Sequence, residues 1–278
     1  MQIFERIADL RAYLKGKTSI GLVPTMGALH EGHLSLIAAS RNENKLTVCS
    51  VFVNPIQFNN PDDLARYPRT LQEDCKMLEA AGCDAVFAPT VAEMYGSKPA
   101  ITFDFGNLER VLEGAFRPGH FNGVGIVVSK LFHIVQPDRA YFGQKDLQQC
   151  LVIRRMIQDL SFPVELIICP IVREKDGLAM SSRNRNLTTY ERSVAPFIYQ
   201  QLQQAGKALK AGKSVSEVKE LVSKAYAEQP DFKLEYFEIA DIETLSSLAA
   251  FRTPAAICVA AYLGKVRLID NLLMGQDS

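Results

Sequence analysis

Short apolar runs alternate with stretches of helical periodicity up to about residue 175, and this alternation restricts the fold more than any other feature. The apolar runs lie at residues 19–23, 46–53, 85–88, 140–142 and 164–169. Because they are apolar on both faces, they are typical of strands in a parallel sheet that helices cover on both sides. The pattern predicts a doubly wound, Rossmann-like α/β domain with its ligand beyond the carboxyl ends of the strands.

Helical periodicity fills the segments between these runs. The predicted helices lie at residues 3–15, 32–42, 70–81, 122–133 and 146–160. Thr70 and Glu73 have the spacing of a capping box, in which each side chain accepts a backbone N–H at the start of a helix. We therefore expect the third helix to begin at Thr70.

The chain becomes more polar after residue 175, where KDGLAMSSRNRNLT predicts an exposed connection. Two further capping boxes, Thr188 with Glu191 and Ser214 with Glu217, predict helices that run to about residues 211 and 228. Strand-like runs follow at residues 234–240, 255–262 and 266–271. Together these features predict a smaller α+β domain.

The chain has 278 residues, enough for two domains, which we expect at residues 1–175 and 176–278. Lys plus Arg equals Asp plus Glu at 31 each, so no net charge draws the chain to nucleic acid or to an anionic membrane surface. The N-terminal segment is amphipathic with acidic residues, unlike a signal peptide, and no apolar run has membrane-spanning length. We expect a cytoplasmic protein.

Six cysteines are scattered along the chain without a CxxC pair, which argues against a zinc site or a disulfide framework. Cys49, Cys169 and Cys258 lie in strongly apolar runs. We interpret them as small buried hydrophobic residues.

The first predicted strand leads into VPTMGALHEGH, which holds two of the four histidines. The chain turns through Gly27 and enters a helix near Gly32, and a helix N-terminus offers N–H groups and partial positive charge to a phosphate. His30 and His33 are spaced i, i+3, so they face the same way in a helical turn. Two imidazoles can stabilise the charge that builds up on an α-phosphate in a transition state. The pair predicts a nucleotide site.

Polar groups also follow two other predicted strands. In FGQKD, Gly143 permits a tight turn, Lys145 supplies a charge for phosphate, and Asp146 can cap the following helix. In FVNPIQF, Asn54 and Gln57 are neutral groups that can orient hydroxyls or a carboxylate, or can simply satisfy the backbone of a turn.

Three segments away from strand ends are also candidates. The loop AMSSRNR carries hydroxyls and guanidinium groups that can fold over a triphosphate, although a solvated linker has the same composition. In RPGHF, Arg117 could contact an anion, and Arg117 and His120 are both candidates for a role in the site. We interpret His133, at the end of a predicted helix, as structural.

Six segments occur together in the order and spacing of one enzyme family: PTMGALHEGH, FVNPIQF, RYPR, RPGHFNGV, FGQKDLQQ and MSSRN. On these motifs the chain resembles the pantothenate synthetases, or pantoate–β-alanine ligases, over essentially its whole length. Their wider relatives are the HxGH nucleotidyl-transferases and class I aminoacyl-tRNA synthetases. MSSRN is similar to the lysine-and-serine signature loop of those enzymes, with Ser181, Ser182 and Arg183 in place of lysines.

The resemblance implies an ATP-dependent, AMP-forming ligation of (R)-pantoate with β-alanine to pantothenate, through a pantoyl adenylate and without a covalent enzyme intermediate. It implies ATP as co-substrate and Mg²⁺ to offset the charge of the triphosphate. It also implies a homodimer formed through the first domain, with the second domain acting as a lid.

The same resemblance implies roles in nucleotide binding. His33 would stabilise or protonate the reacting phosphate with support from His30, Lys145 and Arg183 would contact phosphates, and the backbone of Val172 would touch adenine. The residues expected to bind ATP are Met26, Gly27, Ala28, Leu29, His30, Glu31, Gly32, His33, Gly143, Gln144, Lys145, Asp146, Val172, Met180, Ser181, Ser182 and Arg183.

For the other substrates, the resemblance implies that Gln57 and Gln149 hold pantoate and that Gln57 also reaches β-alanine. Asn54 is a further candidate for the same pocket. The resemblance identifies no protein ligand of the metal, and Asp74 is the one candidate that we name.

Two other functions are open at this point. A different HxGH enzyme, such as a cytidylyl- or adenylyl-transferase, would share the histidine pair but commonly lacks the MSSRN-like loop and the second domain. A nucleotide-binding regulatory or RNA-binding module related to a synthetase belongs to another class. The zero net charge and the lack of a basic stripe count against RNA.

Overall fold

The computed structural model describes residues 1–275 and falls into two compact units. Unit 1 comprises Met1–Gln144 and Gln148–Pro170. Unit 2 comprises Lys145–Leu147 and the described chain from Ile171 onward. The short segment Lys145–Leu147 therefore belongs to unit 2, although the residues on both sides of it belong to unit 1.

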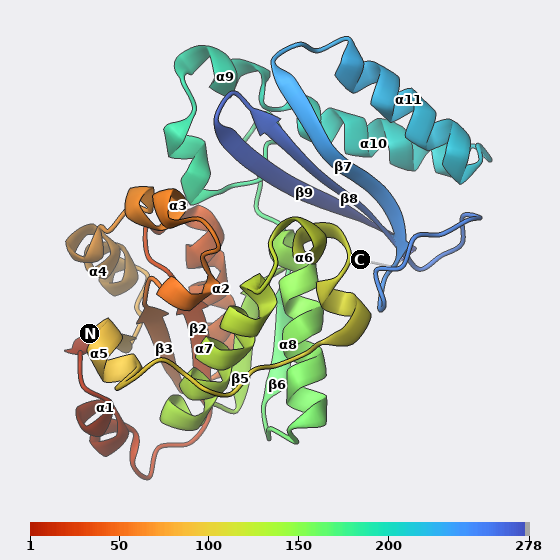
Figure 1. The fold of residues 1–278 in the computed structure, drawn as a ribbon. Coiled ribbons are helices and arrows are strands. Elements are labelled where there is room, and N and C mark those ends of the chain that lie inside the picture. The colour runs from red at the N-terminus through yellow and green to blue at the C-terminus, as the bar shows by residue number, and fades with distance from the viewer. Residues whose placement is uncertain (276–278) are drawn as a thin grey trace. The chain divides into compact units, whose positions relative to one another are not determined.

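Unit 1 is built on a parallel sheet whose strands lie in the order β1-β4-β3-β2-β5-β6 (Figure 1). The strands are β1 (Gln2–Phe4), β2 (Ile20–Thr25), β3 (Leu46–Val51), β4 (Ala85–Phe87), β5 (Arg139–Gly143) and β6 (Glu165–Cys169). The chain adds β3 and β4 on one side of β2, and β5 and β6 on the other. The order therefore reverses between β2 and β5, where ligands bind in sheets of this kind. The predicted doubly wound sheet is confirmed.

Helices cover both faces of this sheet (Figure 1). The helices and 3-10 turns of this part of the chain are α1 (Ile7–Leu14), α2 (Glu31–Glu43), η1 (Pro55–Gln57), α3 (Pro61–Arg66), α4 (Leu71–Ala80), α5 (Val91–Met94), η2 (Gly106–Glu109), α6 (Leu112–Phe116), α7 (His120–Val135), η3 (Gln144–Asp146) and α8 (Leu147–Asp159). Buried residues of α1, α7 and α8 pack on one face, and those of α2 and α4 pack on the other.

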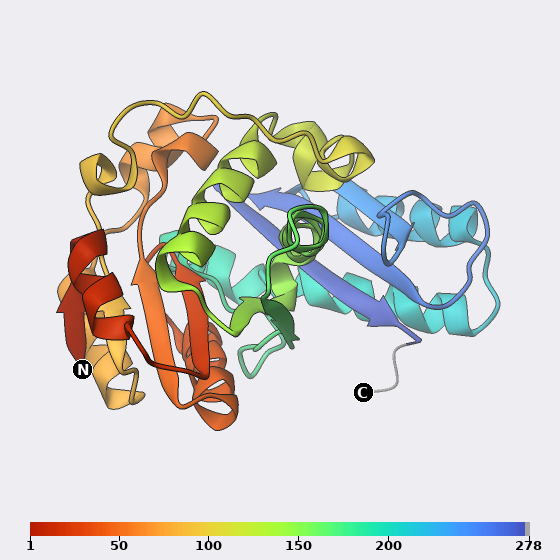
Figure 2. The same ribbon diagram turned by 90° about the horizontal axis from the view of Figure 1, so that it is seen from below.

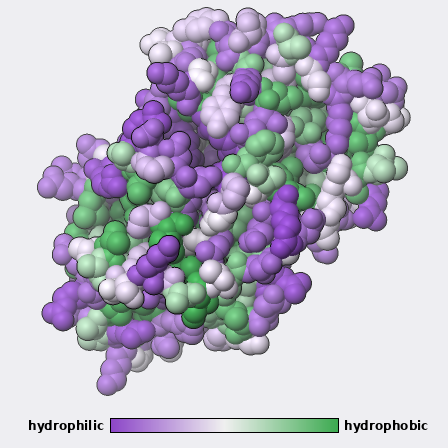
Figure 3. Space-filling model, viewed as in Figure 1, coloured by the Kyte–Doolittle hydropathy of each residue, from purple (hydrophilic) through white to green (hydrophobic). Residues whose placement is uncertain are grey.

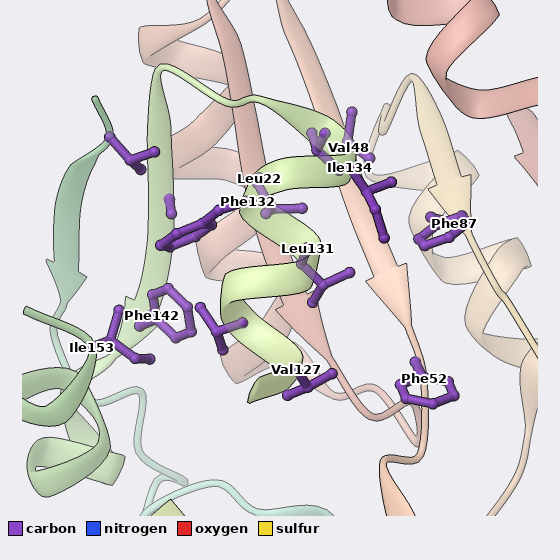
Figure 4. Close-up of a cluster of buried hydrophobic side chains, with 14 of the residues drawn as sticks. Leu22, Val48, Phe52, Phe87, Val127, Leu131, Phe132, Ile134, Phe142 and Ile153 are labelled. Atoms are coloured by element: carbon purple, nitrogen blue, oxygen red, sulfur yellow. The ribbon is translucent and has the colours of Figure 1, made fainter. Parts of the chain in front are cut away.

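The central strands bury both of their faces, as the apolar runs predicted. Leu22 and Val48 belong to the core under α7, whereas their neighbours Val23 and Cys49 belong to the core under α2. Figure 4 shows Leu131 and other side chains of α7 lying over these strands. Because the strands are packed on both sides, the loops at their carboxyl ends start from fixed positions.

The N-terminal segment differs from its prediction, because residues 3–15 are not one helix but a strand followed by a helix. Strand β1 pairs in parallel with β4 at the edge of the sheet, and Ala88 donates its backbone N–H to Phe4 O at 2.8 Å. The helix begins only at Ile7, whose N–H is accepted by Glu93 Oε1 at 2.8 Å. Pairing with a distant strand has overridden the local helical preference.

The capping box predicted at Thr70 is also wrong. Helix α4 does begin after Thr70, but the Thr70 side chain makes no cap hydrogen bond. Its hydroxyl donates instead to Asp74 Oδ2 at 3.2 Å. The buried carboxylate of Asp74 competes for this hydroxyl, because a buried charge needs donors more than an exposed helix end does.

Unit 2 contains an antiparallel sheet in the order β7-β8-β9. Its strands and helices are β7 (Phe232–Asp241), β8 (Ala255–Leu263), β9 (Val266–Met274), η4 (Ser182–Asn186), α9 (Thr189–Val194), α10 (Phe197–Lys210) and α11 (Val215–Ala227). Helices α10 and α11 lie along one side of the sheet and share its core (Figure 2). The predicted α+β class of this part of the chain is confirmed.

The capping boxes at Thr188 and Ser214 are both confirmed. However, the helix expected to continue from Thr188 to about residue 211 is divided into α9 and α10 at Pro196. Proline has no N–H to donate and its ring clashes with the preceding turn, so a helix does not continue through it unchanged. The prediction overlooked this residue.

Within residues 1–275, no helix combines the length and apolar character needed to cross a membrane. Figure 3 shows hydrophilic side chains over much of the face in view, with hydrophobic ones between them. Individual large apolar side chains, such as Ile101 and Phe116, are exposed. Single exposed apolar residues are ordinary features of protein surfaces.

Candidate active site

A buried carboxylate holds the turn between β2 and α2. Gly27 and Ala28 have φ values of 80° and 51°, in the left-handed region that side chains with a Cβ disfavour. A Cβ on Gly27 would lie 2.9 Å from Asp74 Oδ2. Asp74 accepts the backbone N–H of Ala28 at 3.0 Å and that of Leu29 at 2.8 Å. These charge-assisted hydrogen bonds fix an unusual backbone conformation directly before the histidine pair.

His30 and His33 lie together at the N-terminus of α2, as their spacing predicted. His30 is the N-cap residue, and its Nδ1 accepts the backbone N–H of Gly32 at 3.1 Å. A ring nitrogen that accepts carries no proton, so a neutral His30 holds its proton on Nε2. The ring centroids of His30 and His33 are 4.1 Å apart. The imidazoles therefore stand where the helix dipole already favours an anion.

Asn54 and Gln57, which follow β3, bond to each other. Asn54 Nδ2 donates to Gln57 Oε1 at 3.0 Å and to Gly123 O at 3.1 Å. The hydroxyl of Tyr95 donates to Asn54 Oδ1 at 2.8 Å, and burial raises the pKa of Tyr95, which keeps this proton in place. Asn54 makes three hydrogen bonds and is 1% exposed, so it is itself fixed and holds the side-chain amide of Gln57 in one orientation. Gln57 Nε2 in turn lies 3.2 Å from Met26 Sδ.

Arg117 and His120 hold the backbone of the same residue. Arg117 NH1 lies 3.2 Å from His120 Nε2, and His120 Nδ1 lies 2.9 Å from Gln57 O. A guanidinium can only donate, so Nε2 accepts and Nδ1–H donates to the carbonyl. From the sequence, Arg117 was a candidate for an anion contact and either residue was a candidate for a role in the site. In the structure they form a chain of hydrogen bonds that ends on Gln57.

The adjacent glutamines of DLQQ have different surroundings. Gln148 is buried, accepts the N–H of Glu113 at 2.9 Å and donates to Leu108 O and Val111 O at 2.6 and 2.8 Å. It fastens the segment before α7 to the start of α8. Gln149, the expected pantoate contact, is half-buried in the same helical turn.

Several expected nucleotide contacts belong to unit 2. Lys145 Nζ lies 3.8 Å from Asp146 Oδ2, within η3. The backbone N–H of Met180 donates to Val172 O at 3.0 Å, so the expected adenine contact and the start of the MSSR loop are joined. Ser181 caps η4 by accepting the N–H of Arg183 at 3.3 Å. The loop is thus a 3-10 turn with its own cap rather than an unstructured linker.

The remaining candidates lie as follows. Gly143 ends β5, Gln144 begins η3, and Glu31 is exposed in the first turn of α2. His133 is exposed in the last turn of α7, with its ring 5.1 Å from that of Phe162. Its position agrees with a structural interpretation.

Asp74, Tyr95 and Gln148 have roles in the site that no sequence pattern predicted. Asp74 was named only as a guessed metal ligand, whereas its oxygens accept backbone and hydroxyl donors of unit 1. Tyr95 lies 41 residues from its partner Asn54, and no local pattern joins them. The partners of Gln148 lie 35 to 40 residues earlier in the chain, so no local pattern indicates them either.

A sequence profile described as pantoate-beta-alanine ligase matches residues 2–273. The chain belongs to the pantoate–β-alanine ligase family. It is 50% identical to a pantothenate synthetase of Cytophaga hutchinsonii, over 96% of this chain and 97% of the relative. A pantothenate synthetase of Bacteroides thetaiotaomicron is also 50% identical, over 98% of each chain. The protein is therefore an enzyme, a ligase of pantoate and β-alanine.

Solved structures of the same family share the fold. The crystal structure of pantothenate synthetase from Thermus thermophilus has a TM-score of 0.94 and 47% identity, and the match covers 98% of this chain and 99% of that one. A pantoate–β-alanine ligase from Francisella tularensis, complexed with beta-gamma ATP and beta-alanine, has a TM-score of 0.83 and 35% identity. That match covers 98% of this chain and 97% of the other.

Proposed function

We propose that this ligase activates the carboxylate of pantoate with ATP and then transfers the pantoyl group to β-alanine. The observation that carries the proposal is the contact of His30 and His33, with ring centroids 4.1 Å apart, at the N-terminus of α2 and beside the point where the strand order reverses. We place the α-phosphate of ATP there, where the helix dipole, the backbone N–H groups of the first turn and the two imidazoles can all stabilise it. The related Francisella enzyme complexed with beta-gamma ATP and beta-alanine supports both small molecules as substrates.

The chemistry takes two balanced steps. A pantoate carboxylate oxygen attacks the α-phosphorus of ATP, which forms the pantoyl adenylate and expels pyrophosphate. The amine of β-alanine then attacks the acyl carbon, loses a proton and expels AMP, which leaves an amide. A carboxylate resists attack because its oxygen leaves poorly, and AMP is a much better leaving group. Charge that builds up on the phosphate in the first step is the charge that imidazole donors stabilise.

The roles that we assign follow the parts of the site. His33 stabilises or protonates the reacting phosphate, His30 supports it, and Lys145 contacts the phosphates. Gln57 and Gln149 hold pantoate, and Gln57 also reaches β-alanine. The remaining ATP contacts that we propose are Met26, Gly27, Ala28, Leu29, Glu31, Gly32, Gly143, Gln144, Asp146, Val172, Met180, Ser181, Ser182 and Arg183. The hydrogen bonds that fix Gln57 through Asn54 and His120 support its role, because a fixed amide selects one orientation of a ligand.

We propose that Mg²⁺ binds to the enzyme together with ATP. Within residues 1–275, no group of three or more His, Cys, Asp or Glu side chains has a metal-binding arrangement. Asp74 does not fit the part, because both of its oxygens accept hydrogen bonds from the turn and the residue is 1% exposed. Mg²⁺ usually keeps several waters and binds through substrate phosphates, so we propose MgATP as the substrate.

The decisive assay measures AMP and pyrophosphate from ATP with pantoate and β-alanine, each omitted in turn. We expect pantoate-dependent exchange of labelled pyrophosphate into ATP without β-alanine, and AMP release only when β-alanine is added. His33→Ala should abolish the exchange while the circular dichroism spectrum stays unchanged. Full turnover by this variant would refute the role of His33.

The same assay separates the other candidates. A nucleotide-linked product from CTP and an alcohol phosphate would identify a different HxGH transferase. ATP binding without exchange under any combination of substrates would favour a regulatory module. The homodimer is a separate proposal. Sedimentation equilibrium at micromolar concentration tests it: a mass twice that of the 30.9 kDa chain supports a dimer, and the mass of one chain contradicts it.

A further inference from the structure

Lys145 is fastened to unit 2 by a buried amide. The segment Lys145–Leu147 belongs to that unit, whereas Gln144 and Gln148 belong to unit 1. Asn271 of β9 donates its Nδ2–H to Lys145 O at 3.0 Å. Asn271 is 3% exposed, so this hydrogen bond is shielded from competing water.

The residue before Asn271 is part of a buried ion pair. Asp270 receives two parallel hydrogen bonds from Arg173, at 2.7 and 2.9 Å, and its side chain is fully buried. Asp270 Oδ1 also accepts the backbone N–H of Asn271 at 2.8 Å. The guanidinium of Arg173 lies 3.6 Å from the ring centroid of Tyr199, and it donates to Gly177 O at 3.0 Å. Such a bidentate pair has one geometry, so it fixes the middle of β9 firmly.

Arg173 connects this pair to the expected nucleotide contacts. Its neighbour Val172 accepts the backbone N–H of Met180, and Arg173 forms a bridge with Ala179. Asn184 Nδ2 donates back to Ala179 O at 3.0 Å, which ties the serine-containing turn to the same bridge. Burial opposes the ionisation of Asp270 and raises its pKa, while the charges of Arg173 and Lys145 favour the ionised form.

We infer that Asn271 is a positioning residue for ATP activation, and that the Asn271–Asp270–Arg173 cluster holds the phosphate contact Lys145 in register with Val172 and Met180. The inference rests on the proposed function, because it presumes that Lys145 contacts the phosphates. Lys145 follows β5 in sequence, yet its main chain is set by β9, whose Asn271 lies 126 residues later. The ammonium group acts on ATP only if that main chain is correctly placed, and a misplacement of about 1 Å can cost roughly a hundredfold in rate.

The test is a double-mutant cycle in pantoate-dependent pyrophosphate exchange, using Asn271→Ala, Lys145→Met and both together in the full chain. We expect Asn271→Ala to lower the exchange rate about tenfold or more, with the KM of β-alanine in the overall reaction unchanged. In the Lys145→Met background the same substitution should have less than about a twofold effect, because no ammonium group is left to position.

An equal loss from Asn271→Ala in both backgrounds would overturn the inference, as would no loss in either. The proposed role of Lys145 fails separately, if Lys145→Met alone keeps the full exchange rate. Asn271→Ser, which keeps a polar side chain, replaces Asn271→Ala in the cycle if the alanine variant loses the native circular dichroism spectrum.

Tyr226→Phe is the matched control. Tyr226 is a core residue of α11, and burial together with the negative charge of Asp270 raises its pKa. Its hydroxyl is buried without a hydrogen-bond partner among the described residues. Removing that hydroxyl perturbs the same unit without touching Lys145. We expect the exchange rate to stay within about twofold of the parent. A tenfold loss in this control would show that the loss of a buried group elsewhere in unit 2 lowers the rate as much as the change at Asn271, and would overturn the specific role of Asn271.

Discussion

The carboxylate of Asp74 accepts the backbone N–H of Leu29 at 2.8 Å, across 45 residues of sequence. Its other oxygen accepts the N–H of Ala28. The turn that leads from β2 to His30 is thereby held by the first part of helix α4. A residue that contacts no substrate in our proposal thus fixes the backbone from which His30 and His33 project.

Asp74→Asn should therefore damage both stability and activity. An amide can replace only one of the two acceptor oxygens, and its NH₂ group would face a backbone N–H. Leaving a buried donor unsatisfied costs about 1–3 kcal/mol, so we expect a loss of that size in the free energy of unfolding by urea. The turnover number should fall at least about tenfold in protein that remains folded, because the histidine pair loses its fixed geometry.

Glu73→Gln provides the matched control for Asp74→Asn, since it makes the same charge change at the exposed neighbouring residue. It should change neither the urea midpoint nor the turnover number. If the two variants behave alike, Asp74 has no special role in the turn.

Tyr95→Phe should loosen the pantoate pocket. The substitution removes the donor to Asn54 Oδ1 and leaves that buried oxygen unpaired, so Asn54 can turn away from Gln57. We expect the KM of pantoate to rise about tenfold, corresponding to roughly 1.4 kcal/mol, with little change in the KM of ATP. Initial-rate kinetics with each substrate varied measures both constants.

Tyr13→Phe is the comparison for this prediction. Tyr13 packs against Phe4 of the edge strand β1 and is not part of the Asn54 network. We expect both KM values to stay within about twofold of the parent. A rise in the KM of ATP as large as that of pantoate for Tyr95→Phe would contradict a role confined to Gln57.

The titration of the Cys83 thiol should lower the free energy of unfolding as the pH rises from 9 to 11. Burial raises the pKa of this thiol from its usual 9.0 to about 11. At pH values between these limits the unfolded chain has lost the proton that the folded chain keeps, so the folded state binds more protons and stability decreases as pH rises. Cys83→Ala should make that decline shallower, and urea unfolding at about pH 8 and about pH 10 under reducing conditions measures it.

Cys75→Ala serves as the reference in the same series. Cys75 is half-buried, and burial raises its pKa as well, but without the large shift of Cys83. Its removal should alter the slope less than the removal of Cys83. The reverse order would mean that burial does not govern the titration of these thiols.

The fold was largely predictable because its signals are local. The runs at β2 and β3 are apolar on both faces, and that property alone indicates a parallel sheet between two helix layers. Thr188 and Ser214 each have a glutamate three residues later, and both capping boxes formed. The prediction failed at β1, where pairing with β4 decides the outcome, and at Thr70, where the buried Asp74 takes the hydroxyl.

The candidate site was predictable only in part, for the same physical reason. His30 and His33 are three residues apart, at the N-cap and in the first turn of α2, so local geometry brings their rings close, while Asp74 fixes the turn that precedes them. Asn54 and Gln57 are equally close in sequence, yet in the structure the side chain of Asn54 is hydrogen-bonded to Tyr95, Gly123 and Gln57 and serves to hold Gln57. Arg117 was a candidate for an anion contact, and the structure adds that Arg117 and His120 form a chain of hydrogen bonds to the backbone carbonyl of Gln57, which no local pattern indicated.

By itself, the sequence determined the two fold classes, the family and the histidine pair, because each depends on residue order or on contacts within a few residues. Only the tertiary structure decided that Asp74 holds the turn before His30, that Tyr95 and His120 fix Gln57, and that Lys145 is fastened to β9 by Asn271. These are hydrogen bonds between buried groups distant in sequence. A buried polar group must find a partner, but which partner lies within reach is settled only when the strands and helices pack.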